Sequence, residues 1–366
     1  MKKVISIVGA RPNFIKIAPL DKAFRKHRKE VKHLICHTGQ HFDNSMSSVF
    51  FDELGLPKPD FYLGVGSGSH AAQTAKIMLE LEKVLADEQP DMVIVPGDVN
   101  STLAAALVAS KMGIPIAHVE AGLRSFDRTM PEEINRIVTD VVSDLLFVSE
   151  HSGIRNLRDE GIEENRIHFT GNIMIDSLEE HYEMIEQNPV VQKMNLVKEE
   201  YILATFHRPN NVDNAESLAE LLQSLSRLAQ KRPLVFPVHP RTRKNIQSFG
   251  IDTNLHPNLI LTDPLGYIEF LSLMRYAQLV ITDSGGIQEE TTYMGVQCIT
   301  VRKNTERPVT IDVGTNQLVG TDLDRVERTA IDILAGNTKP GRIPELWDGK
   351  TAKRIVEVIM DHLAKE

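Results

Sequence analysis

Carboxylate side chains gather where two apolar runs end in the first half of the sequence. Asp98 follows one run after a short Pro-Gly turn, Glu120 ends the next run, and Glu132 lies in the first turn of a helical pattern that begins at Pro131. Asp98 and Glu132 taken singly could be ordinary helix-start residues. Because all three should converge on the carboxyl edge of one sheet, together they predict a site for proton transfer.

A histidine and an arginine follow an apolar run in the second half of the chain, at 201–206. His207 could carry a proton near neutral pH, and Arg208 could bind an anion. A lone histidine is more often structural, so the functional interpretation depends on His207 facing the carboxylates of the first half. On that basis we expect His207 to belong to the acid–base site.

Small residues, Ser284-Gly285-Gly286, separate a buried-strand pattern from a helical pattern. Glycine lets a ligand approach the backbone, and the N–H groups at a helix start attract anions, which favours a phosphate site. Glu290, one turn into the helix, could accept hydrogen bonds from ribose hydroxyls because a carboxylate is only an acceptor. A tight strand-to-helix turn that binds no ligand would use glycine in the same way, so both interpretations stay open.

Local cations could complete such a site. Arg11 and Lys16 follow the first strand pattern, and Arg307 follows a strand pattern near the end of the chain. The net charge is −9 and no basic stripe interrupts it, so the composition argues against a nucleic-acid partner. A polyanionic ligand must therefore be held by a few local cations and by backbone N–H groups.

Motifs for metals and nicotinamide cofactors are missing from the sequence. The segment 64–68 resembles a dinucleotide loop, but its glycine spacing is wrong and it lacks the strand-then-helix context. His37 and His41 are four residues apart, but the residues between them favour a turn, so a metal pair on a helix is not expected. We expect neither a metal nor an added cofactor.

The elements that must position these residues alternate regularly between strand and helix. This alternation predicts an α/β fold with two Rossmann-like, doubly wound domains facing a central cleft. Strands are expected near 4–8, 32–38, 91–97, 114–119, 145–149, 167–171, 201–206, 233–238, 259–262, 279–282 and 298–302. Helices are expected near 14–27, 71–87, 101–112, 132–143, 152–160, 214–230, 241–248, 267–276, 286–295, 322–335 and 351–365.

The length of 366 residues suits two domains. The stretch 183–200 has little strand character and is rich in Glu, Gln, Asn and Lys, so we expect the boundary nearby. We predict an N-terminal domain of residues 1–175 with the catalytic carboxylates, completed by the C-terminal helix 352–366. Residues 176–351 should form the nucleotide-binding domain.

Cysteine usage and hydropathy indicate the cellular compartment. The two cysteines, Cys36 and Cys298, lie in strand-like apolar runs, and buried free thiols fit a reducing compartment. The apolar run after Met1 is too short for a signal peptide, and no stretch approaches the roughly 18 apolar residues of a membrane span. We expect a cytoplasmic protein without a membrane segment.

The motifs resemble those of the non-hydrolysing UDP-N-acetylglucosamine 2-epimerases, and the resemblance covers nearly the whole chain. The matching segments are 9–12, 38–41, 96–98, 118–124, 131–136, 207–208 and 283–290. The resemblance implies a GT-B type fold, a homodimer, a UDP-sugar substrate and no added cofactor. It also implies reversible inversion at C2, in which UDP leaves to give 2-acetamidoglucal and then adds back.

The resemblance also implies roles for individual residues. The implied catalytic residues are Asp98, Glu120, Glu132 and His207. The residues that match the nucleotide-contacting positions of the family are Arg11, Lys16, Ser284, Gly285, Gly286 and Glu290. We also expect Arg136, Arg208, Phe270 and Arg307 to bind the substrate. Gln40 and His41 lie where some bacterial relatives bind a second, activating UDP-N-acetylglucosamine.

One departure from the family pattern concerns the residues after His207-Arg208. The family usually continues with Arg-Glu-Asn, whereas this chain has Pro209-Asn210-Asn211. A cation and an acid are therefore absent, which bears on allosteric activation and substrate choice. The alternatives are a 2-epimerase of a diacetamido uronic acid sugar, a GT-B glycosyltransferase and a non-catalytic UDP-sugar sensor.

Overall fold

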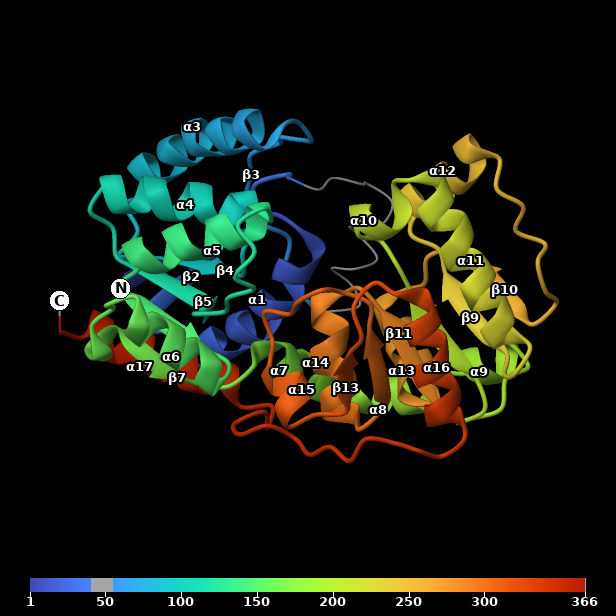
Figure 1. The fold of residues 1–366 in the computed structure, drawn as a ribbon. Helices are drawn as coiled ribbons and strands as arrows, with labels where there is room; N and C mark the ends of the chain where they lie inside the picture. The colour runs from blue at the N-terminus through green and yellow to red at the C-terminus, as the bar shows by residue number, and fades with distance from the viewer. Residues whose placement is uncertain (41–54, 366) are drawn as a thin grey trace. The chain divides into compact units, whose positions relative to one another are not determined.

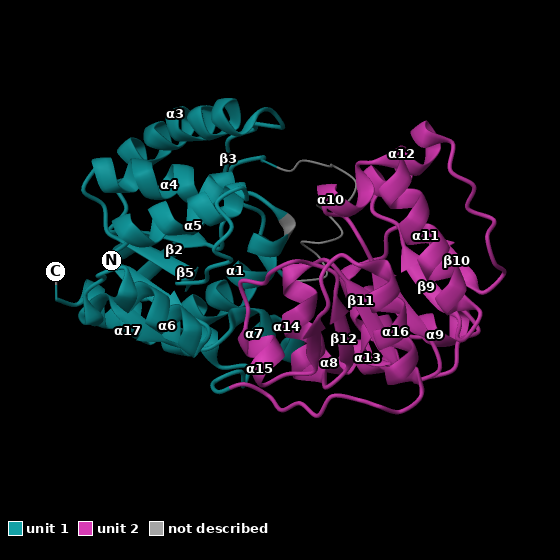
Figure 2. Ribbon diagram, in the orientation of Figure 1, with its two compact units in different colours: residues 1–180, 345–366 teal, residues 181–344 magenta. Residues whose placement is uncertain are grey.

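Two compact units make up the chain. The computed structural model describes residues 1–40 and 55–365. Unit 1 consists of Met1–Glu180 and Glu345–Glu366, and unit 2 consists of His181–Pro344 (Figure 2). The boundary expected at 175/176 falls inside a helix of unit 1, because that helix packs against the first and last helices of the same unit.

Unit 1 is built on a seven-stranded parallel sheet in the order β3-β2-β1-β4-β5-β6-β7. Its strands are β1 (Lys2–Val8), β2 (Val31–His37), β3 (Phe61–Tyr62), β4 (Met92–Pro96), β5 (Ile116–Ala121), β6 (Leu145–Val148) and β7 (Ile167–Phe169). Every residue of the central strands β4 and β5 is buried because helices cover both faces of the sheet.

The helices of unit 1 form two layers. They are α1 (Arg11–Phe24), η1 (Arg25–His27), α3 (His70–Glu88), α4 (Asn100–Lys111), α5 (Pro131–Val142), α6 (His151–Asp159), η2 (Glu164–Arg166), α7 (Ile173–Glu180) and α17 (Thr351–Leu363). Helices α3, α4 and α5 pack side by side, as do α1, α7 and α17 (Figure 1). The last helix therefore completes the first unit.

Helix α3 illustrates how the sequence specifies these elements. The Ser69 side chain accepts a hydrogen bond from the Ala72 N–H and caps the helix start. Ile77, Leu81 and Leu85 follow at intervals of four residues, and all three are buried. The apolar stripe of the helix thus joins the core formed with β1, β2 and β4.

Unit 2 repeats the design with a six-stranded parallel sheet in the order β10-β9-β8-β11-β12-β13. The strands are β8 (Ile202–Thr205), β9 (Leu234–Pro237), β10 (Leu259–Thr262), β11 (Leu279–Thr282), β12 (Gln297–Thr300) and β13 (Asn316–Leu318). The helices are α8 (Tyr182–Gln187), α9 (Val190–Lys193), α10 (Pro209–Val212), α11 (Ala215–Ala229), α12 (Pro240–Phe249), α13 (Tyr267–Arg275), α14 (Gly285–Met294), α15 (Val309–Asp312) and α16 (Leu323–Leu334). Apolar side chains of α11 and α16 form a core with this sheet.

Both sheets change winding direction between two neighbouring strands. The change falls between β1 and β4 in unit 1 and between β8 and β11 in unit 2. Ligands of doubly wound folds bind at the carboxyl ends of the strands at such a point. Asp98 follows β4, His207 follows β8 and Ser284 follows β11, so the fold places predicted site residues at both switch points.

Candidate functional site

Glu120 has an unusual backbone conformation at the carboxyl end of β5. Its φ of 74° lies in the left-handed region that non-glycine residues rarely adopt. The pairing register between β5 and β6 shifts at the same place, between Val119 and Ala121. Such local strain and irregular pairing are concentrated at functional sites, where they re-aim a side chain.

The carboxylate of Glu120 forms an ion pair with the ammonium group of Lys16 in α1. Their side chains are only 6% and 7% exposed, so little solvent screens the pair. Gly97 makes this approach possible: it has a φ of 67°, and a Cβ atom there would lie 2.9 Å from Lys16 Nζ. Lys16, expected to contact the nucleotide, is therefore also the buried partner of a predicted catalytic acid.

Asp98 is held by its neighbours while its carboxylate stays partly open to solvent. Arg136 Nε lies 2.9 Å from Asp98 Oδ2, and the Asp98 side chain is 28% exposed. The amide of Asn135 donates to the Asp98 carbonyl oxygen over 2.8 Å. These contacts fix the position of the Asp98 carboxylate, which a group that transfers a proton requires.

Glu132 and Glu133 occupy different environments within the first turn of α5. Glu133 is buried and accepts hydrogen bonds from the backbone N–H groups of Ser125 and Phe126 and from Arg136. Glu132 is half-buried and makes no hydrogen bond or ion pair with the described part of the chain. Glu133 thus holds the loop at Ser125 and Phe126 in place, whereas the carboxylate of Glu132 is available to a substrate.

A buried ionic network lies beneath these acids, and its pairing of residues far apart in the chain was not predicted. His118 Nδ1 lies 2.6 Å from Asp140 Oδ1, and His118 Nε2 lies 2.8 Å from the Gly97 carbonyl oxygen. Arg124 pairs with the other Asp140 oxygen at 2.7 Å. Burial alone would raise the pKa of Asp140, but His118 and Arg124 hold the pKa below its ordinary value. The network anchors the Gly97 turn that precedes Asp98.

The structure describes Gln40, one of the two residues expected to bind an activator. Gln40 is buried, and its side-chain oxygen accepts hydrogen bonds from the N–H and hydroxyl of Ser101 at 3.0 and 2.6 Å. His41 lies outside the described residues. Arg11 begins α1. A role in activation stays a prediction for Gln40 and His41.

At the switch point of unit 2, His207 contacts an acid that sequence reasoning missed. His207 Nδ1 lies 3.0 Å from Asp283 Oδ1; the Asp283 side chain is fully buried, and that of His207 is 42% exposed. Burial favours a raised pKa for Asp283, but hydrogen bonds from His207, Asn211 and the Arg208 backbone bring the pKa below its ordinary value. Asp283 comes just after the carboxyl end of a strand, as Asp98 does, and this position could have identified it.

Helix α14 presents its amino end directly after β11. Ser284 occupies the cap position in extended conformation, and Gly285 and Gly286 form the first helical turn. A Cβ atom at Gly286 would meet nothing within 4 Å of the described chain. Glu290 is buried one turn further on. Open space at the first N–H groups of a helix suits an anionic ligand.

The predicted cations of unit 2 differ in their surroundings. Arg208 donates from Nε to the Asp283 carbonyl oxygen over 2.9 Å. Arg307 is buried, pairs with Glu289 at 2.9 Å and also contacts Glu306. Its guanidinium would lie 2.6 Å from a Cβ atom at Gly285, so it borders the helix start. Phe270 is half-buried in α13.

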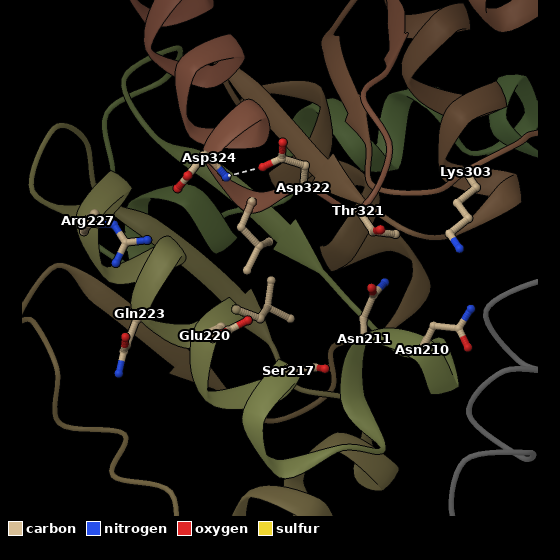
Figure 3. A pocket seen from close by; sticks show the side chains of 12 residues that line it. Asn210, Asn211, Ser217, Glu220, Gln223, Arg227, Lys303, Thr321, Asp322 and Asp324 are labelled. Carbon is tan, nitrogen blue, oxygen red and sulfur yellow. Dashed lines mark hydrogen bonds between the residues drawn. The ribbon is translucent and has the colours of Figure 1, made fainter.

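A separate pocket of about 770 Å³ lies between α11 and α16 in unit 2 (Figure 3). Polar side chains dominate its wall, including Asn210, Ser217, Glu220, Arg227 and Asp322. None of the predicted site residues lines it. Asn210, which departs from the family pattern, is therefore part of the wall of this pocket.

Metal-site clusters and membrane-spanning helices are both absent from the described residues. In residues 1–40 and 55–365, no group of three or more His, Cys, Asp or Glu side chains has the arrangement of a metal site. None of the helices in the same ranges combines the length and apolar composition that crossing a bilayer requires.

Comparison with known proteins identifies relatives along the full chain. The family model described as UDP-N-acetylglucosamine 2-epimerase matches residues 22–360. A UDP-N-acetylglucosamine 2-epimerase of Methanococcus maripaludis is 42% identical over 98% of both chains. A UDP-2,3-diacetamido-2,3-dideoxy-D-glucuronate 2-epimerase of Pseudomonas aeruginosa is 40% identical over 98% of this chain and 99% of that protein.

A solved structure extends the similarity to three dimensions. The Methanocaldococcus jannaschii UDP-GlcNAc 2-epimerase, crystallised with UDP-GlcNAc and UDP, superimposes with a TM-score of 0.90. The two chains are 42% identical, and the alignment covers 99% of this chain and 100% of the other. The α/β fold with two parallel sheets is the GT-B-like fold expected from the sequence. Family match, full-length relatives and fold agree that this chain belongs to the UDP-N-acetylglucosamine 2-epimerase family.

Proposed function

We propose that this enzyme reversibly converts UDP-N-acetylglucosamine to UDP-N-acetylmannosamine. The observation that carries the proposal is the pair of supported carboxylates at the ends of two neighbouring strands. Asp98 is paired with Arg136 after β4, and Glu120 is paired with Lys16 at the end of β5. An acid–base reaction on a sugar needs such groups, whereas binding a UDP-sugar does not.

Elimination explains why the site needs both acids and an anion-binding helix start. No carbonyl acidifies the C2–H bond of this sugar, so direct deprotonation would be slow. We propose that a carboxylate removes the C2 proton while the electron pair forms a C1–C2 double bond and UDP leaves from C1. The products of this step are 2-acetamidoglucal and UDP. Protonation of C2 on the other face and return of UDP to C1 give the epimer.

The two units have different tasks in this proposal. Unit 1 supplies the acid–base groups Asp98, Glu120 and Glu132. Unit 2 binds the diphosphate through the start of α14 and contributes His207, which could exchange protons or stabilise the leaving group. Negative charge grows on the departing UDP, so stabilisation of its diphosphate lowers the barrier. The remaining nucleotide contacts come from Arg11, Lys16, Arg208, Phe270, Glu290 and Arg307.

The reaction is tested by incubating the enzyme with UDP-N-acetylglucosamine in D2O and following H2 by proton NMR. Deuterium incorporation at C2 together with the manno epimer is the expected result. Release of free sugar, transfer to an acceptor or no reaction would contradict the proposal and support hydrolase, glycosyltransferase or sensor activity. Asp98→Asn should lose exchange while UDP still binds, and retained turnover would remove Asp98 from the catalytic set.

A second substrate tests the nearest alternative. The Pseudomonas aeruginosa relative is named for a diacetamido uronate sugar and is almost as similar as the archaeal enzymes. The same exchange experiment should therefore be run with the UDP-diacetamido uronate. We expect a higher kcat/KM for UDP-N-acetylglucosamine, the substrate in the name of the matching family. The reverse order would assign the chain to the modified sugar.

We further propose that the enzyme is a cytoplasmic homodimer. Cys36 and Cys298 are both free and buried, and burial raises the pKa of each thiol to about 12, so both stay protonated. Unpaired, inert thiols suit a reducing compartment. The dimer rests on family resemblance, and sedimentation equilibrium tests it: a monomer mass of 41.0 kDa at working concentration would contradict it.

A further inference from the structure

We propose that Asp283 is a positioning residue that holds the His207 ring with Nδ1 inward and Nε2 toward the substrate. The inference rests on the proposed function, because it assigns His207 a part in the reaction. Asp283 Oδ1 lies 3.0 Å from His207 Nδ1. The ring is 42% exposed, and Nε2 makes no hydrogen bond within the described ranges. Nε2 is therefore the ring nitrogen that remains for a ligand.

Asp283 is itself held rigidly. Its carboxylate accepts hydrogen bonds from the backbone N–H groups of His207, at 3.2 Å, and of Arg208, at 3.0 Å. The Asn211 amide donates to Oδ2 over 2.9 Å. Arg208 Nε donates to the Asp283 carbonyl oxygen. A buried carboxylate with this many donors cannot rotate freely, so the ring that it contacts is also fixed.

The contact selects one chemical form of the histidine. A carboxylate is only an acceptor, so Nδ1 must carry a hydrogen toward Asp283. In the neutral ring the other nitrogen, Nε2, then has the free electron pair and is the atom that can accept a proton. A carboxylate in this position sets the tautomer and the orientation of the imidazole ring. It affects the reaction in this way without contacting the substrate.

The geometry also links two sequence segments that are far apart. Asp283 directly follows β11 and precedes Ser284 at the start of α14, while His207 follows β8. These strands are neighbours in the sheet. Other charged or titratable groups near the ring are Arg208 and His239, whose ring centroid is 6.0 Å from that of His207. Unlike Arg208 and His239, Asp283 contacts Nδ1 directly.

A spectroscopic test uses the unmodified enzyme and does not depend on activity. Nitrogen-15 NMR of labelled histidine at alkaline pH should show His207 with hydrogen on Nδ1 and none on Nε2. The His207 signals are assigned by their loss in His207→Gln. A ring that carries its hydrogen on Nε2 would overturn the inference, even if the epimerase activity were established.

A kinetic test uses a double-mutant cycle. Asp283→Asn should lower kcat about 10²-fold, because misplacing a reacting group by about 1 Å has effects of this size. In the His207→Gln background, the same substitution should lower kcat less than about threefold, because Asp283 acts through His207. Equal losses in both backgrounds would show an independent role and overturn the inference.

Controls separate positioning from general damage. Asp176→Asn is the matched variant, because Asp176 is also a buried carboxylate that accepts backbone hydrogen bonds, from Thr351 and Ala352 in unit 1. It should change the urea midpoint but not kcat. UDP affinity of Asp283→Asn, measured by calorimetry, should stay within about threefold of the parent. If the parent enzyme shows no epimerisation, the proposed function fails, whereas the NMR result still decides the position of the ring.

Discussion

Arg136 donates through Nε to Asp98 Oδ2 over 2.9 Å, and the same guanidinium contacts Glu133. One buried cation thus fixes a predicted catalytic acid and the acid that anchors the neighbouring loop. We expect Arg136→Lys to keep the positive charge but lose the fork that reaches both carboxylates. The enzyme should fold, and kcat should fall on the order of 10²-fold because Asp98 is no longer held in place.

Steady-state kinetics checks this expectation. The loss should appear in kcat more than in KM, since Arg136 is 2% exposed and holds Asp98, which we propose acts in the transition state. A variant with unchanged kcat and a raised KM would instead support direct substrate binding by Arg136. Arg128→Lys, at an exposed arginine of the loop that precedes α5, serves as the control.

Removing one partner of the buried ion pair between Lys16 and Glu120 should strongly lower the free energy of unfolding. Lys16→Met leaves Glu120 as a buried charge without this partner, which typically costs about 3–5 kcal/mol in the free energy of unfolding. Lys16→Met combined with Glu120→Gln should be more stable than Lys16→Met alone, because no uncompensated charge remains. Urea unfolding of the two variants measures the difference. A double variant that is less stable than Lys16→Met would contradict the pairing.

Sequence reasoning recovered the strand–helix alternation because apolar runs and amphipathic periods are local signals. It missed β3 and β13, which are two and three residues long. Such short strands gain their conformation from pairing with a neighbour, which a single segment does not reveal. Sequence position also placed Asp98 and His207 after their strands, because a strand end can be located without knowing the fold.

Side-chain partners were harder to predict. Lys16 and Glu120 are 104 residues apart in sequence, and His207 and Asp283 are 76 apart. Only the strand order brings these pairs together. The positive φ of Glu120 was equally hidden, because a glutamate gives no local signal for the left-handed region. The sequence therefore predicted which residues lie at the strand ends, but not which of them contact each other.

The two glycines at the start of α14 should respond differently to substitution. A Cβ atom at Gly285 would lie 2.6 Å from Arg307 Nη1 and 2.9 Å from Glu306 Oε1, whereas one at Gly286 meets nothing within 4 Å of the described residues. Gly285→Ala should lower the melting temperature. Gly286→Ala should preserve it, since alanine is accepted in a helix.

Both variants should bind UDP more weakly, and Gly286→Ala is the more informative. If the diphosphate occupies the open space at this helix start, the added methyl group displaces it, and we expect affinity to fall about tenfold or more. Calorimetric titration with UDP gives the result. Unchanged affinity in a Gly286→Ala protein of parental stability would place the diphosphate elsewhere.

Asp176 should give the stability of the enzyme a characteristic pH dependence. The residue is buried beneath the start of α17, and burial raises its pKa to about 6, although it accepts hydrogen bonds from the Thr351 and Ala352 N–H groups. A folded-state pKa above the unfolded value of about 3.9 means that the native state binds the proton more tightly. Its stabilising contribution is therefore complete below about pH 4 and is lost as the pH rises through about 6.

Asp176→Asn isolates this contribution, because asparagine does not titrate over the same range. The unfolding free energy of the parent relative to the variant should fall by up to about 3 kcal/mol between pH 4 and pH 7, from about two pKa units at 1.36 kcal/mol each. Urea unfolding at several pH values provides the comparison. A difference that grows with pH would mean that the ionised carboxylate stabilises the start of α17, as an anion at a helix N-terminus can. The helix dipole would then outweigh burial at this site.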